Sequence, residues 1–79
     1  MEYTIIIHEA EEGGYWAEIP VLPGCYSQGE TIEETLANTK EAVESHLIAL
    51  KEEKHRIPKE TMLTISRIEV PFSRRLAKV

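Results

Sequence analysis

A single long helical pattern constrains this 79-residue chain more than any other feature. From Thr31 onward, apolar residues recur at three-and-four spacing over about five turns. The resulting stripe contains Ile32, Leu36, Thr39, Val43, Leu47 and Leu50. A helix with one apolar stripe must bury it against another element, and the remaining sequence offers only a sheet.

Both ends of this helix carry boundary signals. Thr31 and Glu34 form a capping box, in which the Thr31 hydroxyl accepts from the backbone N–H of Glu34. At the other end, Lys51 and Lys54 suit the negative end of the helix dipole, and Ile57-Pro58 marks a stop. The helix is therefore predicted to run from Thr31 to about Lys54.

The residues around this helix read as short strands. Residues 2–9 and 14–19 alternate, and the Glu-Glu-Gly-Gly sequence between them suits a hairpin turn. Pro23-Gly24 is the signature of a type II turn, which leaves Cys25–Gln28 as a third strand, and Thr61–Val70 is rich in β-branched residues. The predicted class is α+β in the order β-β-β-α-β, a small and mainly antiparallel sheet with one helix on one face.

Alternation assigns the apolar residues of the first two strands to opposite faces of the sheet. The face beneath the helix receives Tyr3, Ile5, Ile7, Tyr15, Ala17 and Ile19. The other face keeps Ile6 and Trp16, for which this chain has no second covering helix. These two residues are either candidates for an oligomer interface or side chains half-covered by loops.

Composition limits the kind of protein. With 42% hydrophobic and 29% charged residues, the chain fits one small domain, assigned to residues 1–72, followed by a short basic tail at 73–79. The apolar runs, such as Ile5–Ile7 and Leu47–Leu50, are far below the ~18 residues of a spanning helix. The N-terminus lacks a secretion pattern and Cys25 has no partner for an internal disulfide, so a cytoplasmic location is expected.

Charge is distributed very unevenly along the chain. Residues 1–39 carry eight Glu and no base (0 − 8 = −8), whereas residues 40–79 carry nine bases and six Glu (9 − 6 = +3). An acidic surface of this kind repels nucleic acid and attracts a basic partner, or it simply keeps a small protein dissolved.

The residue types argue against catalysis. The chain contains no Asp, and its adjacent Glu pairs belong to a turn or to helix surfaces rather than to converging strands. His8, His46 and His55 lack metal-ligand spacing, and Cys25 has no adjacent base. We therefore predict no catalytic residue, no metal and no cofactor.

Residues 11–47 combine a Gly-Gly-aromatic hairpin, the turn Pro20-Val21-Leu22-Pro23-Gly24-Cys25, the helix entry Gln28-Gly29-Glu30-Thr31 and an Ala-containing helix. In this order and spacing the chain resembles the HicB family of antitoxins, in the short form built around one degenerate, partial RNase H-like module. The resemblance implies an antitoxin that binds and occludes a small, basic, RNA-cleaving HicA-like toxin, and it implies a homo-oligomer, a dimer or a tetramer.

The C-terminus departs from the family pattern. Many members of the family carry a DNA-binding helix-turn-helix or ribbon-helix-helix segment there, whereas seven residues with Arg74, Arg75 and Lys78 follow the predicted last strand here. Three charges in a tail would bind phosphate weakly and without sequence choice, so operator binding is not expected.

Two hypotheses follow from the sequence. The first is a toxin-binding antitoxin whose candidate contacts are Glu11, Glu12, Tyr15, Trp16 and Glu33, chosen for charge and exposure. The second is a stand-alone oligomeric module, or a remnant RNase H-like enzyme, with no toxin partner. A small basic protein encoded beside this chain would favour the first.

Overall fold

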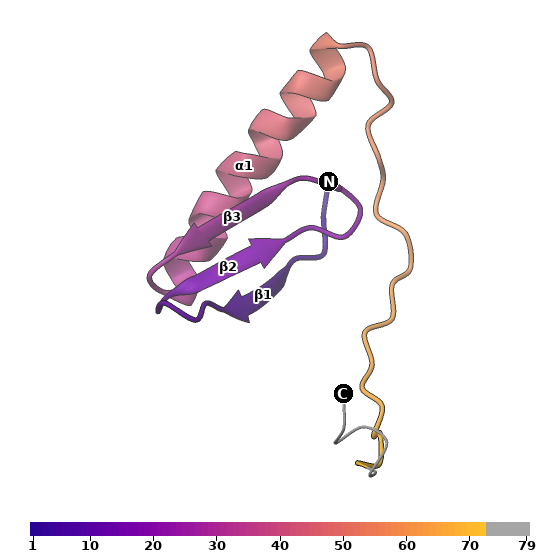
Figure 1. The fold of residues 1–79 in the computed structure, drawn as a ribbon. Helices are drawn as coiled ribbons and strands as arrows, with labels where there is room; N and C mark the ends of the chain where they lie inside the picture. The colour runs from indigo at the N-terminus through magenta and orange to yellow at the C-terminus, as the bar shows by residue number, and fades with distance from the viewer. Residues whose placement is uncertain (73–79) are drawn as a thin grey trace.

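The computed structural model describes residues 1–72 of the chain. Three short strands, β1 (Ile6–Glu9), β2 (Tyr15–Glu18) and β3 (Tyr26–Gly29), are followed by one long helix, α1 (Ile32–Glu52). The strands form an antiparallel sheet in the order β1-β2-β3, and α1 lies over β3 and β2 (Figure 1). The predicted α+β class, with a single helix on one face of an antiparallel sheet, is confirmed.

The two predicted turns form where glycine permits them. The backbone N–H of Ala10 donates to the Gly14 carbonyl (3.0 Å), and Gly13 and Gly14 adopt φ values of 100° and 75°. At the second turn, the N–H of Cys25 donates to the Leu22 carbonyl (3.0 Å) while Gly24 has φ of 84°, as a type II turn requires. These turns fix the register that pairs Trp16 with His8 on one side and with Gln28 on the other.

The helix begins as its cap predicts but packs through a different face at its start. Thr31 caps α1, its hydroxyl accepting from the Glu34 N–H at 3.0 Å. Thr35 and Thr39 are fully buried against the sheet, whereas Ile32 and Leu36, which we assigned to the buried stripe, are 49% and 43% exposed.

The reason for this correction is the short distance between α1 and β3. A Cβ added to Gly29 would lie 2.6 Å from the Thr35 nitrogen and 2.7 Å from its Oγ1, so the first two turns of α1 have room only for small side chains. The Thr35 and Thr39 hydroxyls are satisfied within the helix, donating to the carbonyls of Thr31 (2.7 Å) and Thr35 (2.6 Å). Buried threonine is therefore compatible with this contact.

The apolar core lies further along the helix. Ile19, Leu22 and Cys25 are buried at its centre, and Ala17 is buried in β2. Residues from the N-terminal segment and from the middle of α1 pack around this centre: Tyr3, Ile5, Val21, Ala42, Val43 and Leu47. The predicted inner face of the sheet is thus correct for Tyr3, Ile5, Ala17 and Ile19.

The helix ends in a Schellman arrangement. The N–H of His55 donates to the Leu50 carbonyl (2.8 Å) and that of Lys54 to the Lys51 carbonyl (3.0 Å). Lys54 adopts the left-handed conformation, with φ of 62°, at a position where glycine is the usual residue.

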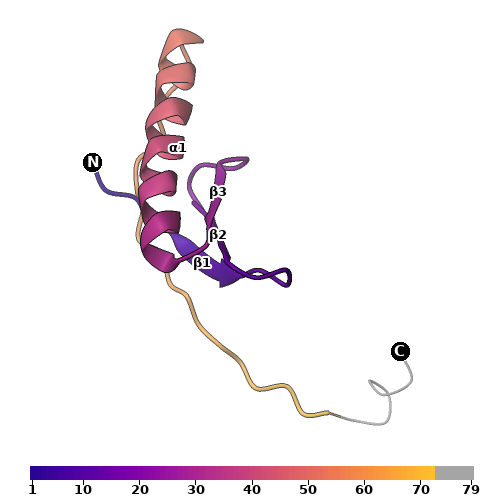
Figure 2. The ribbon, with the colours of Figure 1, turned by 90° about the vertical axis from the view of Figure 1, so that its left-hand side faces the viewer.

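The predicted last strand, Thr61–Val70, is wrong for this chain on its own. After α1 the backbone runs as an extended coil away from the helix and sheet (Figures 1 and 2), and residues 61–72 are all exposed. Their β-branched residues suit an extended backbone, but a strand also needs a neighbour to pair with, and residues 61–72 pair with no strand of the described chain.

The basic tail predicted at residues 73–79 lies outside the residues that the structure describes. Within residues 1–72, no helix combines the length and the apolar character needed to cross a bilayer.

Candidate protein-binding site

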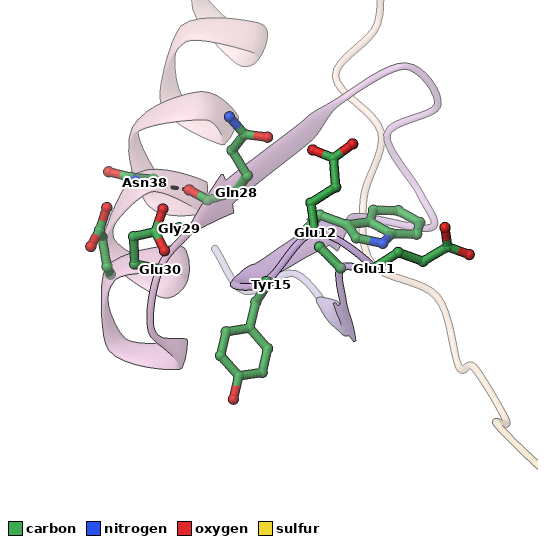
Figure 3. Close-up of a pocket in the computed structure, with 11 residues that line it drawn as sticks. Glu11, Glu12, Tyr15, Gln28, Gly29, Glu30 and Asn38 are labelled. Atoms are coloured by element: carbon green, nitrogen blue, oxygen red, sulfur yellow. Dashed lines mark hydrogen bonds between the residues drawn. The ribbon is translucent and has the colours of Figure 1, made fainter.

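An open hollow of about 720 Å³, here called the acidic hollow, lies between the β1–β2 hairpin and the start of α1. Four carboxylates and two aromatic rings contribute to its lining: Glu11, Glu12, Glu30, Glu34, Tyr15 and Trp16. Gln28 and Asn38 line it as well, and no Lys or Arg of residues 1–72 does. Figure 3 shows Glu11 and Glu12 extending from the hairpin and Glu30 lying on the opposite side, close to Gln28 and Asn38.

Glycine brings the two sides of the acidic hollow together. A Cβ added to Gly14 would lie 2.7 Å from the Gly29 carbonyl oxygen, so the end of the hairpin meets the turn between β3 and α1. The Asn38 side-chain amide then donates to the Gln28 carbonyl (2.8 Å), tying α1 to β3 beside the hollow (Figure 3). Glu11 and Glu12 thereby face the same space as Glu30 and Glu34.

The charge of the acidic hollow points to a basic partner. Four carboxylates on the rim of one hollow produce a local negative potential that attracts cationic side chains and is screened over roughly 8–10 Å at physiological salt. The Tyr15 and Trp16 rings add apolar surface of the kind that anchors protein interfaces and stacks on arginine. In the part of the chain that the structure describes, no three His, Cys or Glu side chains gather in a way that suits a metal ion.

The structure brings together four of the five residues chosen from the sequence. Glu11, Glu12, Tyr15 and Trp16 line the acidic hollow, whereas Glu33 does not. Glu30 and Glu34 take the place expected of Glu33. A signal for them was present, because Glu34 is the capping-box residue beside Thr31 and Glu30 directly follows Gly29, the glycine that allows the close approach.

The two residues proposed for an oligomer interface lie on the face of the sheet away from α1. Ile6 and Trp16 are half-buried, and Trp16 stacks on His8 with ring centroids 4.1 Å apart and 18° between the planes. His8 Nε2 lies 3.6 Å from a Glu18 carboxylate oxygen. Tyr26, which is 61% exposed, extends the same apolar surface with its ring centroid 6.2 Å from that of Trp16.

Cys25 belongs to the core and not to this site. It is 5% exposed and packs with Ile19 and Leu22. Burial raises the pKa of the Cys25 thiol above its ordinary value, so the nucleophilic thiolate is disfavoured. The thiol therefore acts as a small buried apolar group.

The fold and the sequence both have known counterparts. The structure superposes on a crystal structure of the Burkholderia pseudomallei antitoxin HicB with a TM-score of 0.69 at 23% identity, covering 99% of this chain and 80% of that one. A UPF0150 protein of Thermoplasma acidophilum is 43% identical over 60 residues, which make up 76% of this chain and 87% of that protein. Another, from Synechocystis, is 41% identical over 61 residues, 77% of each chain.

A family model supplies the assignment. The model described as HicB-like antitoxin of bacterial toxin–antitoxin systems matches residues 3–76, which is almost the whole chain. The match includes the hairpin, the end of β3 and the helix start that together build the acidic hollow, and it includes the Pro-Gly turn. The chain therefore belongs to the HicB-like antitoxin family of bacterial toxin–antitoxin systems.

Proposed function

We propose that this chain neutralises a small, basic, RNA-cleaving toxin of HicA type by binding and occluding it, without catalysing a reaction. The observation that carries this proposal is the acidic hollow, where Glu11, Glu12, Glu30 and Glu34 line the same space as two aromatic rings and no base from the described part of the chain contributes. A basic toxin brings the complementary charge. Complementary charge speeds encounter and favours the correct partner over others.

The hollow suits a protein partner better than a small metabolite. Glu11 and Glu12 lie on a surface turn, Glu30 lies just before α1, and Glu34 lies in the first turn of α1. Figure 3 shows the carboxylates of Glu11, Glu12 and Glu30 spread apart instead of pointing at one atom. A spread of like charges matches several lysines or arginines on a facing surface. An enclosed apolar pocket with a few converging polar groups, as small ligands prefer, is a different arrangement.

Co-expression with the protein encoded beside this chain, which the proposal expects to be small and basic, tests the proposal. The two proteins should co-purify as one complex, and the chain should abolish RNA cleavage by the purified toxin in proportion to the amount of complex. A double variant, Glu11→Gln with Glu12→Gln, should raise the dissociation constant at least tenfold. Glu41→Gln with Glu44→Gln changes two exposed carboxylates of α1 outside the hollow and provides the matched control.

Self-association and place of action complete the proposal. We infer a homo-oligomer because Ile6, Trp16 and Tyr26 form an apolar surface on the side of the sheet that α1 does not cover. The proposed place of action is the cytoplasm, where an RNA-cleaving toxin meets its substrate. If no basic partner co-purifies while the oligomer persists, the alternative of a stand-alone oligomeric module replaces the antitoxin.

A further inference from the structure

The segment formed by residues 61–72, here called the C-terminal arm, is the most exposed apolar part of the described chain. Its large side chains have the following exposed fractions: Met62 100%, Ile68 86%, Phe72 81%, Ile65 65%, Val70 61% and Leu63 41%. At about 150 Å² or more for each large side chain, two copies of the arm expose well over the ~1,000 Å² that a stable interface needs. A run of this kind marks an interaction site.

The start of the arm is held beside the free edge of the sheet. The Tyr3 hydroxyl donates to the Pro58 carbonyl (2.5 Å), and the Thr4 N–H donates to a Glu60 carboxylate oxygen (3.0 Å), which the Thr4 hydroxyl also contacts. Residues 58–60 therefore run alongside residues 3–4 in the same direction. The next residues of the N-terminal segment lead into β1, and the arm instead departs from the domain (Figures 1 and 2).

β1 offers an unpaired edge to such an arm. In the order β1-β2-β3, one side of β1 pairs with β2, and no backbone hydrogen bond within residues 1–72 uses the other side. At the opposite edge, α1 lies over β3 and its Asn38 occupies the Gln28 carbonyl. An exposed edge strand presents backbone donors and acceptors to any extended segment that reaches it.

The chain's own β1 does not hold the arm. After residue 60 the arm leaves the domain (Figures 1 and 2), and residues 61–72 are all exposed, so the β1 edge stays unpaired within residues 1–72. A second copy supplies both a free edge and a free arm, and the exchange closes on itself around a twofold axis.

The charge of the arm favours a second copy of the chain, and not a basic toxin, as the partner of the arm. The arm carries one Arg and one Glu, Arg67 and Glu69 (1 − 1 = 0), whereas residues 1–60 carry thirteen Glu and five bases (5 − 13 = −8). A basic partner finds its complement on the body of the domain and not on a neutral apolar arm. Two neutral arms do not repel each other. In an extended strand the apolar side chains of the arm alternate between the two faces of the sheet, with Leu63 and Ile65 on one face and Ile68 and Val70 on the other.

We propose that two copies of this chain exchange their C-terminal arms, so that each arm adds as a strand to the free β1 edge of the other copy. The sequence pattern that predicts a strand at 61–70 is then satisfied between chains rather than within one. This inference deepens the proposed self-association, and it does not depend on toxin binding.

Sedimentation and hydrogen exchange of the full chain test the exchange. The wild type should sediment at twice its 9.0 kDa mass, with the amides of β1 and of the arm residues that pair with it protected. Ile65→Lys, at a residue that the alignment of residue 4 with residue 60 places opposite the end of β1, should raise the dimer dissociation constant at least tenfold and remove that protection. Ile48→Lys, at an isoleucine that is 58% exposed on α1, makes the same change away from the arm and should leave the dimer intact.

Four results would overturn the arm exchange: a wild type that stays monomeric at 100-fold the concentration used for hydrogen exchange, a dimer whose arm amides are unprotected, equal weakening of the dimer by both lysine variants, or a monomer with a protected arm. The last result would show that the arm pairs within its own chain. Toxin neutralisation is read separately. A monomer that neutralises the toxin removes only the arm exchange, and a dimer that binds no toxin removes only the antitoxin proposal.

Discussion

Gly29→Ala tests whether the close contact between α1 and β3 holds the fold together. The added Cβ would lie 2.6 Å from the Thr35 nitrogen and 2.7 Å from Thr35 Oγ1, closer than carbon atoms normally approach. Because one of these atoms belongs to the backbone, α1 has to move. Overpacking of this kind costs about 1–3 kcal/mol, and weakening the Thr35–Thr31 hydrogen bond adds about 1 kcal/mol.

A smaller effect of Gly29→Ala acts in the opposite direction and stabilises the fold. Replacing glycine by alanine reduces the entropy of the unfolded chain and stabilises by about 0.4–1 kcal/mol where the backbone allows alanine. Gly29 is not among the glycines with positive φ, so backbone strain does not enter. We therefore expect a net loss of about 2–3 kcal/mol in the free energy of unfolding, or roughly 8–20 °C in Tm for a domain of this size.

Urea denaturation followed by circular dichroism, at one fixed protein concentration, provides the measurement. Gly13→Ala is the comparison, because Gly13 has φ of 100° with nothing within 4 Å of a new Cβ. Its loss of about 1–2 kcal/mol would report left-handed strain without a clash. A Gly29→Ala variant as stable as the wild type, or more stable, would show that the helix does not press on the strand and would refute the packing argument.

Two further predictions concern the helix end and the core. Lys54→Gly should stabilise the fold by about 1 kcal/mol in the same assay, because Lys54 has φ of 62° at the Schellman position. As the control, Lys51→Gly inside the last turn of α1 should destabilise the fold by a similar amount. A neutral or destabilising Lys54→Gly would contradict the assigned helix end. Cys25 should react with an aromatic disulfide reagent at neutral pH only after unfolding, since it is 5% exposed and its thiol pKa is raised by burial. The raised pKa also means that its contribution to stability is complete below the unfolded value of about 9.0 and is lost as the pH rises through the folded value. Rapid labelling of the native protein, or stability that increases from pH 8 to pH 10, would argue against the buried position.

Local chemistry made much of the fold predictable. The hairpin follows from Gly13 and Gly14, the type II turn from Pro23-Gly24, and the helix start from Thr31, because in each case a few adjacent residues determine the backbone conformation. The class of the fold follows from one amphipathic helix that needs a sheet. These features depend on residues close together in the chain.

The errors come from contacts between distant residues. Ile32 and Leu36 fit the apolar period, yet the short α1–β3 distance at Gly29 reserves that face for Thr35, which the predicted stripe left out, and for Thr39, which it included. Threonine is not counted as strongly apolar in a periodicity analysis, so the burial of Thr35 depends on a spacing that only the folded chain reveals. The strand predicted at 61–70 failed similarly, because residue type favours an extended backbone but does not supply a pairing partner.

The candidate site was predictable in its chemistry but not in its membership. Acid enrichment before residue 40 indicated an acidic surface, and the hairpin residues Glu11 and Glu12 line the acidic hollow. The sequence alone did not distinguish Glu33 from Glu34, because neighbouring residues in a helix point about 100° apart and the orientation of α1 on the sheet was unknown. The close approach of Gly14 to Gly29 decides which acids share the hollow.

The rate at which this chain associates with the toxin partner that the co-purification identifies, measured by stopped flow at low and high salt, tests the central claim most directly. Glu11→Lys with Glu12→Lys should slow association at least tenfold at low salt and flatten its salt dependence, while Glu41→Lys with Glu44→Lys, which makes the same change in net charge outside the acidic hollow, should slow it far less. Equal effects of the two double variants, or an unchanged rate for the hairpin variant, would contradict the claim that the acidic hollow is where the partner binds.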